Sequence, residues 1–306
     1  MSVVDKTATA GDPPPQTPGA REVRGAGALL QYWRLLRRDQ LGMVGLVLVL
    51  LMVGSAIFAD LIVPYDPIQI MVGPRLAPPS WDHWLGTDHI GRDVLSRVIM
   101  GGRVALEVAV ATLAAALSVG LLLGLIAGFG PRWLDNGMLL GFDAVRSFPV
   151  IIFALALVTL LGPSLSTVIL VVAITSIPIY ARIVRTQTQA LKSNEFIVAE
   201  RAMGAGPARI LGVHVLPNVI GPLLILASMD VPLVVTLEAG LSFLGMGVRP
   251  PTPSWGTILN DGYSYIRNSP WPVIAGGLPI VITTIGFTFL GEALRDIFDP
   301  KLRKDL

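Results

Sequence analysis

Six stretches of this 306-residue chain are apolar and nearly free of charge over the length that a membrane helix needs. A helix requires about 20 consecutive apolar residues to cross the hydrocarbon core of a bilayer. One longer run is divided by Gly162-Pro163, because proline lacks a backbone donor and clashes with the preceding turn. We therefore expect an all-α integral membrane protein with six transmembrane helices, at 40–59, 108–131, 136–161, 165–183, 219–241 and 271–294.

The composition agrees with lipid as the solvent. Hydrophobic residues make up 53% of the chain and charged residues 14%, whereas a soluble domain averages about 25% charged residues. The net charge of +2 comes from scattered basic residues, which makes nucleic acid a poor partner. The absence of cysteine excludes disulfides, thiolate metal sites and thiol catalysis.

The basic residues predict the orientation, since the loops on the cytoplasmic side of a membrane protein are enriched in Lys and Arg. Placing both ends of the chain in the cytoplasm puts most of these residues on that side. The opposite side then holds only Arg75, Arg92, Arg97, Arg103, Arg249 and Arg267. We further expect a disordered cytoplasmic tail at 1–28, rich in Pro, Gly, Ala and Thr, followed by a single transmembrane domain at 29–306.

Two features of the spans concern packing and polarity. Gly120, Gly124 and Gly128 recur at every fourth position, which predicts a close helix–helix contact through small residues. Asp230 lies near the middle of the fifth span and Glu238 near its end. Carboxylates in the bilayer should face protein or water. They either line a translocation path or make structural hydrogen bonds.

The segment between the fourth and fifth spans predicts a helix–turn–helix. Asn194 suits the N-cap of a short helix that ends at Gly204, and Pro207 suits the first turn of a second helix. Pro217 would mark the next bend. Phe196, Ile197 and Met203 would then be exposed apolar groups among charged neighbours, as in a docking surface or an ordinary amphipathic connector.

This segment resembles the EAA loop of bacterial ABC importer permeases, in which Ala199, Gly204 and Leu216-Pro217 fall at the family's spacing. Val198 stands where the pattern has Glu, and Glu200 where it has its second Ala. Further stretches are similar to the C-type permease subunit of dipeptide, oligopeptide or nickel transporters, and together they run along about nine-tenths of the chain: 86–97, 180–185, 214–218, 241–247 and 250–256.

The resemblance implies a non-catalytic permease subunit of the bacterial inner membrane that works by alternating access. Its partners would be a homologous second permease, one or two ABC ATPase subunits that bind ATP and Mg, and an extracytoplasmic substrate-binding protein. The family's coupling loop corresponds here to Glu195, Phe196, Ala199, Glu200, Arg201, Ala202, Met203, Gly204, Ala205 and Arg209. The loop that faces the binding protein corresponds to a segment with Pro251, Trp255, Tyr263 and Tyr265, although these aromatic residues also suit a belt at the lipid headgroups.

The sequence contains no recognisable motif for catalysis, phosphate binding or metal binding. A phosphate-binding P-loop requires Gly-Lys followed by Ser or Thr, and none of the four lysines follows a glycine. The histidines do not have a metal-binding spacing, and no arrangement of nucleophile and base points to a catalytic residue. The alternative function is a secondary transporter driven by an ion gradient, which would work without an ATPase.

Overall fold

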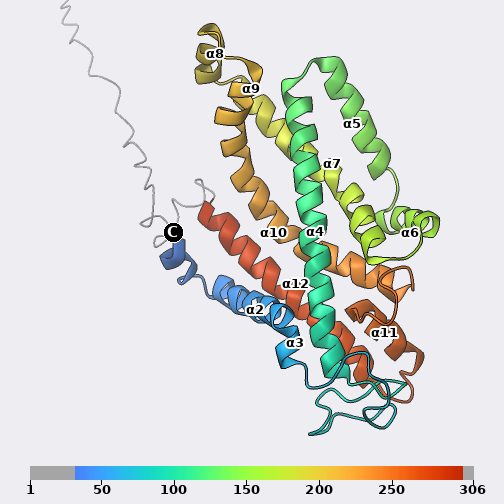
Figure 1. Ribbon diagram of the computed structural model, residues 1–306. Helices are drawn as coiled ribbons and strands as arrows, with labels where there is room; N and C mark the ends of the chain where they lie inside the picture. The colour runs from blue at the N-terminus through green and yellow to red at the C-terminus, as the bar shows by residue number, and fades with distance from the viewer. Residues whose placement is uncertain (1–31, 299–306) are drawn as a thin grey trace, which may run out of the picture.

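The computed structural model describes residues 32–298, and within that range the regular secondary structure is helical apart from one isolated β-bridge between Thr87 and Asp93. The predicted tail at 1–28 lies outside the described residues, as do the two ends of the predicted domain at 29–306. Figure 1 shows the helices as a bundle with α8 at one end and the long 63–93 loop at the other. In chain order the elements are α2 Gln40–Ile57, α3 Ala59–Ile62, α4 Val94–Phe129, α5 Arg132–Arg146, α6 Val150–Leu161, α7 Leu165–Lys192, α8 Glu195–Ala202, α9 Pro207–Arg209, the π-helical η1 Ile210–Val215, α10 Leu216–Phe243, α11 Trp255–Ser264 and α12 Trp271–Phe298.

Five helical segments of the described chain are long and apolar enough to cross a membrane: α2, α4, α7, the continuous stretch from α9 through α10, and α12. The pair α5 and α6 makes a sixth if the two are counted as one span. The membrane character and the all-helical class predicted from the sequence are thus confirmed.

The third predicted span, 136–161, is wrong as a single straight helix. It is divided into α5 and α6, which are bent by 86° relative to each other at residues 147–149. Pro149 explains the break, because its ring disfavours helical geometry at Phe148 and removes a backbone donor at the start of α6. Near its start, α5 is held to α7, since Nη2 of Arg185 donates to Oδ2 of Asp135 at 2.6 Å.

The predicted small-residue contact is confirmed, and its partner is α7. A Cβ atom added at Gly120 would lie 2.7 Å from Cβ of Tyr180, one at Gly124 would lie 2.5 Å from Cβ of Val184, and one at Gly128 would lie 2.6 Å from Cβ of Thr188. The contact residues are four apart on both helices, which matches one face of each. The backbone of α4 can approach α7 this closely only because these positions lack side chains.

Pro217 does not mark a bend, which corrects the sequence prediction. Residues from Pro207 to Phe243 form one continuous helical stretch that includes the π-helical turn η1. The N–H of Leu216 donates to the carbonyl of Leu211, five residues back. Pro217 follows this π-helical turn, whose hydrogen bonding is already shifted from the α-helical pattern. The α9 segment is therefore continuous with a spanning helix, and α8 is joined to it by the turn at 203–206.

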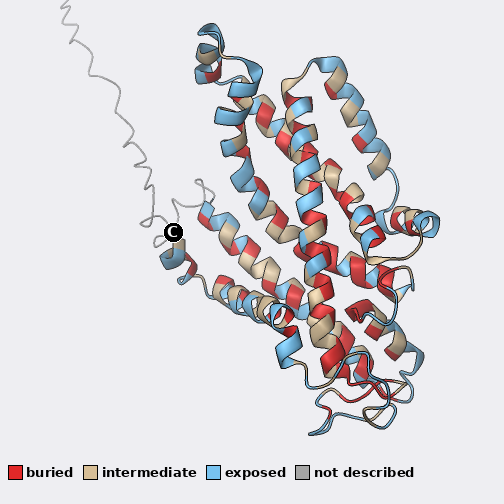
Figure 2. Cartoon of the chain, in the orientation of Figure 1, coloured by how far each residue is buried: buried red, intermediate tan, exposed pale blue. Residues whose placement is uncertain are grey.

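Burial is uneven along the bundle. Figure 2 shows many buried residues where α4, α10 and α11 meet, near the 63–93 loop, whereas α8 and α9 are largely exposed at the opposite end. Trp255 at the start of α11 is part of the buried region. Its side chain packs over Gly101 and Gly102 of α4, and its indole N–H donates to the carbonyl of Val98 at 2.9 Å.

Candidate functional site

Three large apolar side chains are exposed on α8 and the turn after it. Phe196, Val198 and Met203 are 46%, 55% and 76% exposed. Ile197, which the sequence pattern also placed at the surface, is fully buried, and Val198 takes its place. Exposed apolar groups gathered at one protruding end are typical of a surface that another protein covers. We call Phe196, Val198 and Met203 the α8 surface.

The turn after α8 is built as the sequence predicts. Gly204 has φ of +88°, a left-handed conformation that suits glycine at the end of a helix. The N–H of Ala205 donates to the carbonyl of Glu200, which closes the turn. Pro207 then begins α9 in its first turn. Asn194 is the N-cap of α8 by position, although its side chain makes no capping hydrogen bond.

Glu200 connects α8 to η1. Its Oε1 lies 3.4 Å from Nε2 of His214, and the His214 ring packs edge-on against Phe196 with centroids 5.9 Å apart. These contacts bring α8 against η1, the turn that continues into α10.

Two cations connect the loop to α4. The guanidinium carbon of Arg201 lies 5.0 Å from the ring centroid of Phe129, and Nζ of Lys192 lies 5.3 Å from the same centroid. Lys192 also donates to the carbonyl of Phe129 at 2.9 Å. Phe129 is the last residue of α4. The loop therefore contacts the end of α4 through Phe129, and α8 contacts η1, which leads into α10, through His214.

The remaining residues of the predicted loop surround these contacts. Ala205 is partly buried. The others are exposed: Glu195, Ala199, Ala202, Gly204 and Arg209.

The two acids of α10 are engaged within the chain. The hydroxyl of Tyr180 on α7 donates to Oδ2 of Asp230 at 2.6 Å, and Asp230 is partly exposed. Glu238 is fully buried and accepts from the hydroxyl of Ser242 at 2.7 Å. Glu238 therefore packs inside this chain, whereas Asp230 is partly accessible.

The residues predicted to face the binding protein differ in how far they are buried. Trp255 is only 3% exposed and holds α11 to α4, so its side chain presents no surface. Tyr263 is 62% exposed and Pro251 is exposed. Tyr265 stacks on His89 with ring centroids 5.1 Å apart.

A buried charge cluster at this end of the molecule was missed from the sequence. Arg92 and Arg97 both bind Oδ2 of Asp88, with Nε of Arg92 at 2.6 Å, and both reach Oδ2 of Asp261 on α11, at 3.1 and 3.2 Å. Burial alone would raise the pKa of Asp88, but the backbone N–H of Arg92 and the charges of Arg97 and Arg92 outweigh it and hold that pKa below its ordinary value. The cluster joins the 63–93 loop, α4 and α11.

Asp88, His89 and Asp261 bring possible metal-ligand atoms within 4.8 Å of one another. Arg92 and Arg97 already bind one oxygen of each carboxylate and place two positive charges beside them. This arrangement disfavours a cation.

The chain matches two family models. Residues 120–304 match the model described as "Binding-protein-dependent transport system inner membrane component". Residues 29–79 match the "N-terminal TM domain of oligopeptide transport permease C".

Curated relatives of similar length carry related names. The chain is 36% identical to the dipeptide transport system permease protein DppC of Alkalihalophilus pseudofirmus, covering 89% of this chain and 90% of the relative. It is 37% identical to the di/tripeptide transport system permease protein DppC of Pseudomonas aeruginosa, covering 90% and 93%. It is also 37% identical to the glutathione transport system permease protein GsiD of Pectobacterium atrosepticum, covering 89% and 91%.

The fold is similar to that of a solved chain from the MetNI methionine ABC transporter in an inward-facing conformation. The TM-score is 0.54 at 21% identity, and the match covers 66% of this chain and 97% of the other. At this identity the likeness concerns the fold alone.

Proposed function

The chain belongs to the family of binding-protein-dependent transport system inner membrane components, and from this membership we propose that it forms half of the translocation path for di- or oligopeptides or related small solutes. The relatives named for dipeptides, tripeptides and glutathione support this solute class. As a permease of the inner membrane, the chain carries no ATPase of its own. ATP and Mg would be bound by separate ATPase subunits.

We propose a topology of six spans with both ends in the cytoplasm, in which α5 and α6 together act as the third span. The distribution of basic residues supports it, because the α8 end of the bundle carries Arg182, Arg185, Lys192, Arg201 and Arg209. In this orientation α8 lies in the cytoplasm, and the 63–93 loop and α11 lie outside.

The α8 surface is the proposed docking site for an ATPase subunit. This proposal rests on one observation above all, an apolar surface at Phe196, Val198 and Met203 whose carrier helix is fixed to α4 and α10. An apolar patch without a mechanical connection could bind a partner but could not transmit its movement. The contacts of Arg201 with Phe129 and of Glu200 with His214 supply that connection.

Alternating access would follow from paired movement of two permease subunits. A loaded binding protein would dock at the outer end, where Pro251, Tyr263 and Tyr265 are the candidate contacts. Closure of the ATPase dimer would move α8 and, through it, α4 and α10. Because Tyr180 joins α7 to α10 through Asp230, movement of α10 would act directly on this hydrogen bond.

Co-purification tests the assignment directly. The full chain, extracted in mild detergent, should recover a second permease and P-loop ATPase chains, identified by mass spectrometry. The gradient-driven alternative requires that the chain purify alone and still transport in liposomes without ATP. That result would contradict the proposal.

A further inference from the structure

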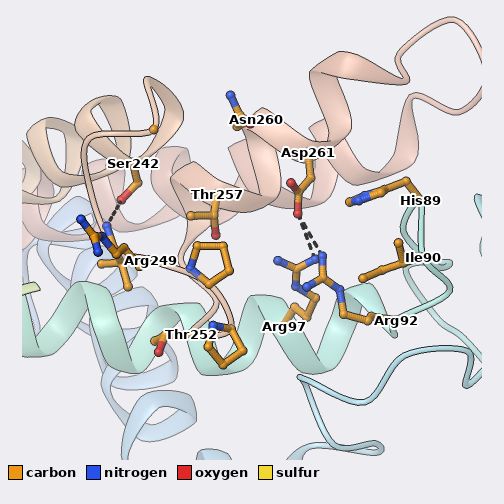
Figure 3. A pocket seen from close by; sticks show the side chains of 14 residues that line it. His89, Ile90, Arg92, Arg97, Ser242, Arg249, Thr252, Thr257, Asn260 and Asp261 are labelled. Atoms are coloured by element: carbon orange, nitrogen blue, oxygen red, sulfur yellow. Dashed lines mark hydrogen bonds and ion pairs between the residues drawn. The ribbon is translucent and has the colours of Figure 1, made fainter. Parts of the chain in front are cut away.

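A cavity of about 320 Å³ lies beside the buried charge cluster, between the start of α4, α11 and the 245–254 loop. This volume is at the lower end of the range for small-molecule sites, about 300–1,000 Å³. Figure 3 shows Arg92 and Arg97 directed toward Asp261 on one side of the cavity and Arg249 on the other, with Thr257 between them.

The charges around the cavity do not balance. Three arginines, Arg92, Arg97 and Arg249, line the cavity, whereas the carboxylates bound to two of them are only Asp261 and Asp88, which leaves one positive charge in excess. Within the described residues, Arg249 makes no ion pair or hydrogen bond, and it is exposed at the rim. Arg249 therefore carries the excess positive charge and can bind an anion without first breaking another ion pair.

Unused hydrogen-bonding capacity reinforces this reading. Arg97 has only 4% of its side chain exposed, yet its Nε has no hydrogen-bond partner in the part of the chain that the structure describes. Arg92 binds through Nε and Nη2, so its Nη1 remains available. Arginine donors in a shielded site match the two oxygens of a carboxylate better than any other common biological group except phosphate.

The cavity also offers an acceptor, which argues against a simple anion. Both arginines bind Asp261 through Oδ2, and Oδ1 of that carboxylate is left to accept an N–H. A peptide terminus presents a carboxylate next to an amide N–H. A site with arginine donors on two sides and a carboxylate oxygen that neither arginine binds is complementary to that pair of groups.

We propose that this cavity binds the terminal carboxylate of the transported solute at the outer mouth of the path. The inference rests on the proposed function and extends it, because it assigns recognition of a chemical group to the permease itself. Dipeptides, tripeptides and glutathione all carry a free carboxylate. Arg249 would capture that group at the rim, and Arg92 and Arg97 would hold it deeper in the cavity.

The test compares trialanine with trialanine amide, which lacks the terminal negative charge. The full chain with its co-purified subunits is placed in lipid nanodiscs without binding protein, and binding is followed by saturation-transfer NMR. We expect trialanine to bind about tenfold more tightly than the amide, as for the loss of one charge-assisted hydrogen bond. Arg249→Gln should remove this preference, and Arg75→Gln, an exposed arginine outside the cavity, should keep it.

Arg249 is the residue of choice because it is exposed and its substitution leaves the buried cluster intact. Equal binding of acid and amide, or an unchanged preference in Arg249→Gln, would overturn the inference. A variant that binds trialanine normally but no longer captures the loaded binding protein would also overturn it, since the carboxylate would then come from that protein. In each of these cases the ATPase chains would still co-purify, so the proposed function would stand.

Discussion

Arg201 lies over the ring of Phe129, with its guanidinium carbon 5.0 Å from the ring centroid. The contact joins the last turn of α8 to the last residue of α4. Lys192 lies near the same ring, so one aromatic side chain receives two cations from the α7–α8 segment. Phe129 is therefore the residue through which the exposed loop contacts the end of α4.

The strength of this contact can be measured by a double-mutant cycle. Arg201→Gln removes the cation, and Phe129→Leu keeps an apolar side chain without the ring. We expect a coupling free energy of about 0.5–1 kcal/mol, as for cation–π pairs near the surface. The measurement is the free energy of unfolding of the four proteins in a detergent titration. Strictly additive effects would show that the two side chains do not interact.

A charge at the α8 surface should separate ATP hydrolysis from transport. Phe196→Glu places a carboxylate where we propose that a partner protein buries an apolar side chain, and an unpaired charge is costly to bury. We expect transport in proteoliposomes to fall by about tenfold or more. Phe196→Leu, which keeps the apolar character, should retain most of the activity. If Phe196→Glu transports normally, α8 is not the docking element.

The contact between α4 and α7 should tolerate no added methyl group at its centre. In Gly124→Ala the new Cβ would lie 2.5 Å from Cβ of Val184 and 2.6 Å from the carbonyl oxygen of Ala181. We expect a loss of about 1–3 kcal/mol in the free energy of unfolding, typical of overpacking.

Gly141→Ala is the matched control, because a Cβ at Gly141 in the middle of α5 would meet nothing within 4 Å. Alanine is also the better helix former. This variant should be as stable as the parent chain or slightly more stable. A Gly124→Ala variant as stable as Gly141→Ala would contradict the close packing of α4 on α7.

Asp88 should make the free energy of unfolding depend on pH in the acidic range. Because its pKa lies below the ordinary value of 3.8, the ionised carboxylate stabilises the fold above about pH 4, and this contribution is lost as the pH falls through the lowered pKa. Asp88→Asn leaves two buried arginines with one carboxylate, and at pH 7 we expect a loss of about 3 kcal/mol or more.

Thermal unfolding from pH 7 to pH 3 tests this expectation. The difference between Asp88→Asn and the parent chain should shrink as the solution becomes more acidic. Asp82→Asn, at an exposed position of the same loop, should follow the parent chain throughout. A difference that stays constant with pH would exclude Asp88 as the titrating group.

The sequence predicted features that depend on local pattern. Apolar runs predicted the spans, the spacing of Gly120, Gly124 and Gly128 predicted the close contact, and Gly204 predicted the end of α8. The bend at 147–149 also had a local signal in Pro149, but the apolar residues on both sides of it suggested one continuous span.

Features that join distant segments could not be predicted. Asp261 is far from Arg97 in sequence, and only the packing of α11 on α4 brings their side chains together. Trp255 likewise looked like a surface aromatic residue, because nothing in its neighbourhood shows that Gly101 and Gly102 leave room for its ring. The role of Glu200 depends on His214, which lies on the far side of the turn.

Site-specific cross-linking from Met203 tests the central claim most directly. The chain contains no cysteine, so Met203→Cys introduces a single thiol, at a side chain that is 76% exposed in the parent chain. In membranes that hold the assembled transporter, a short thiol cross-linker should join this position to a P-loop ATPase chain, identified by mass spectrometry. Tyr263→Cys, at the opposite end, should not give that product. A cross-link from Met203→Cys to the extracytoplasmic binding protein, or an ATPase cross-link from Tyr263→Cys, would contradict both the orientation and the coupling role of α8.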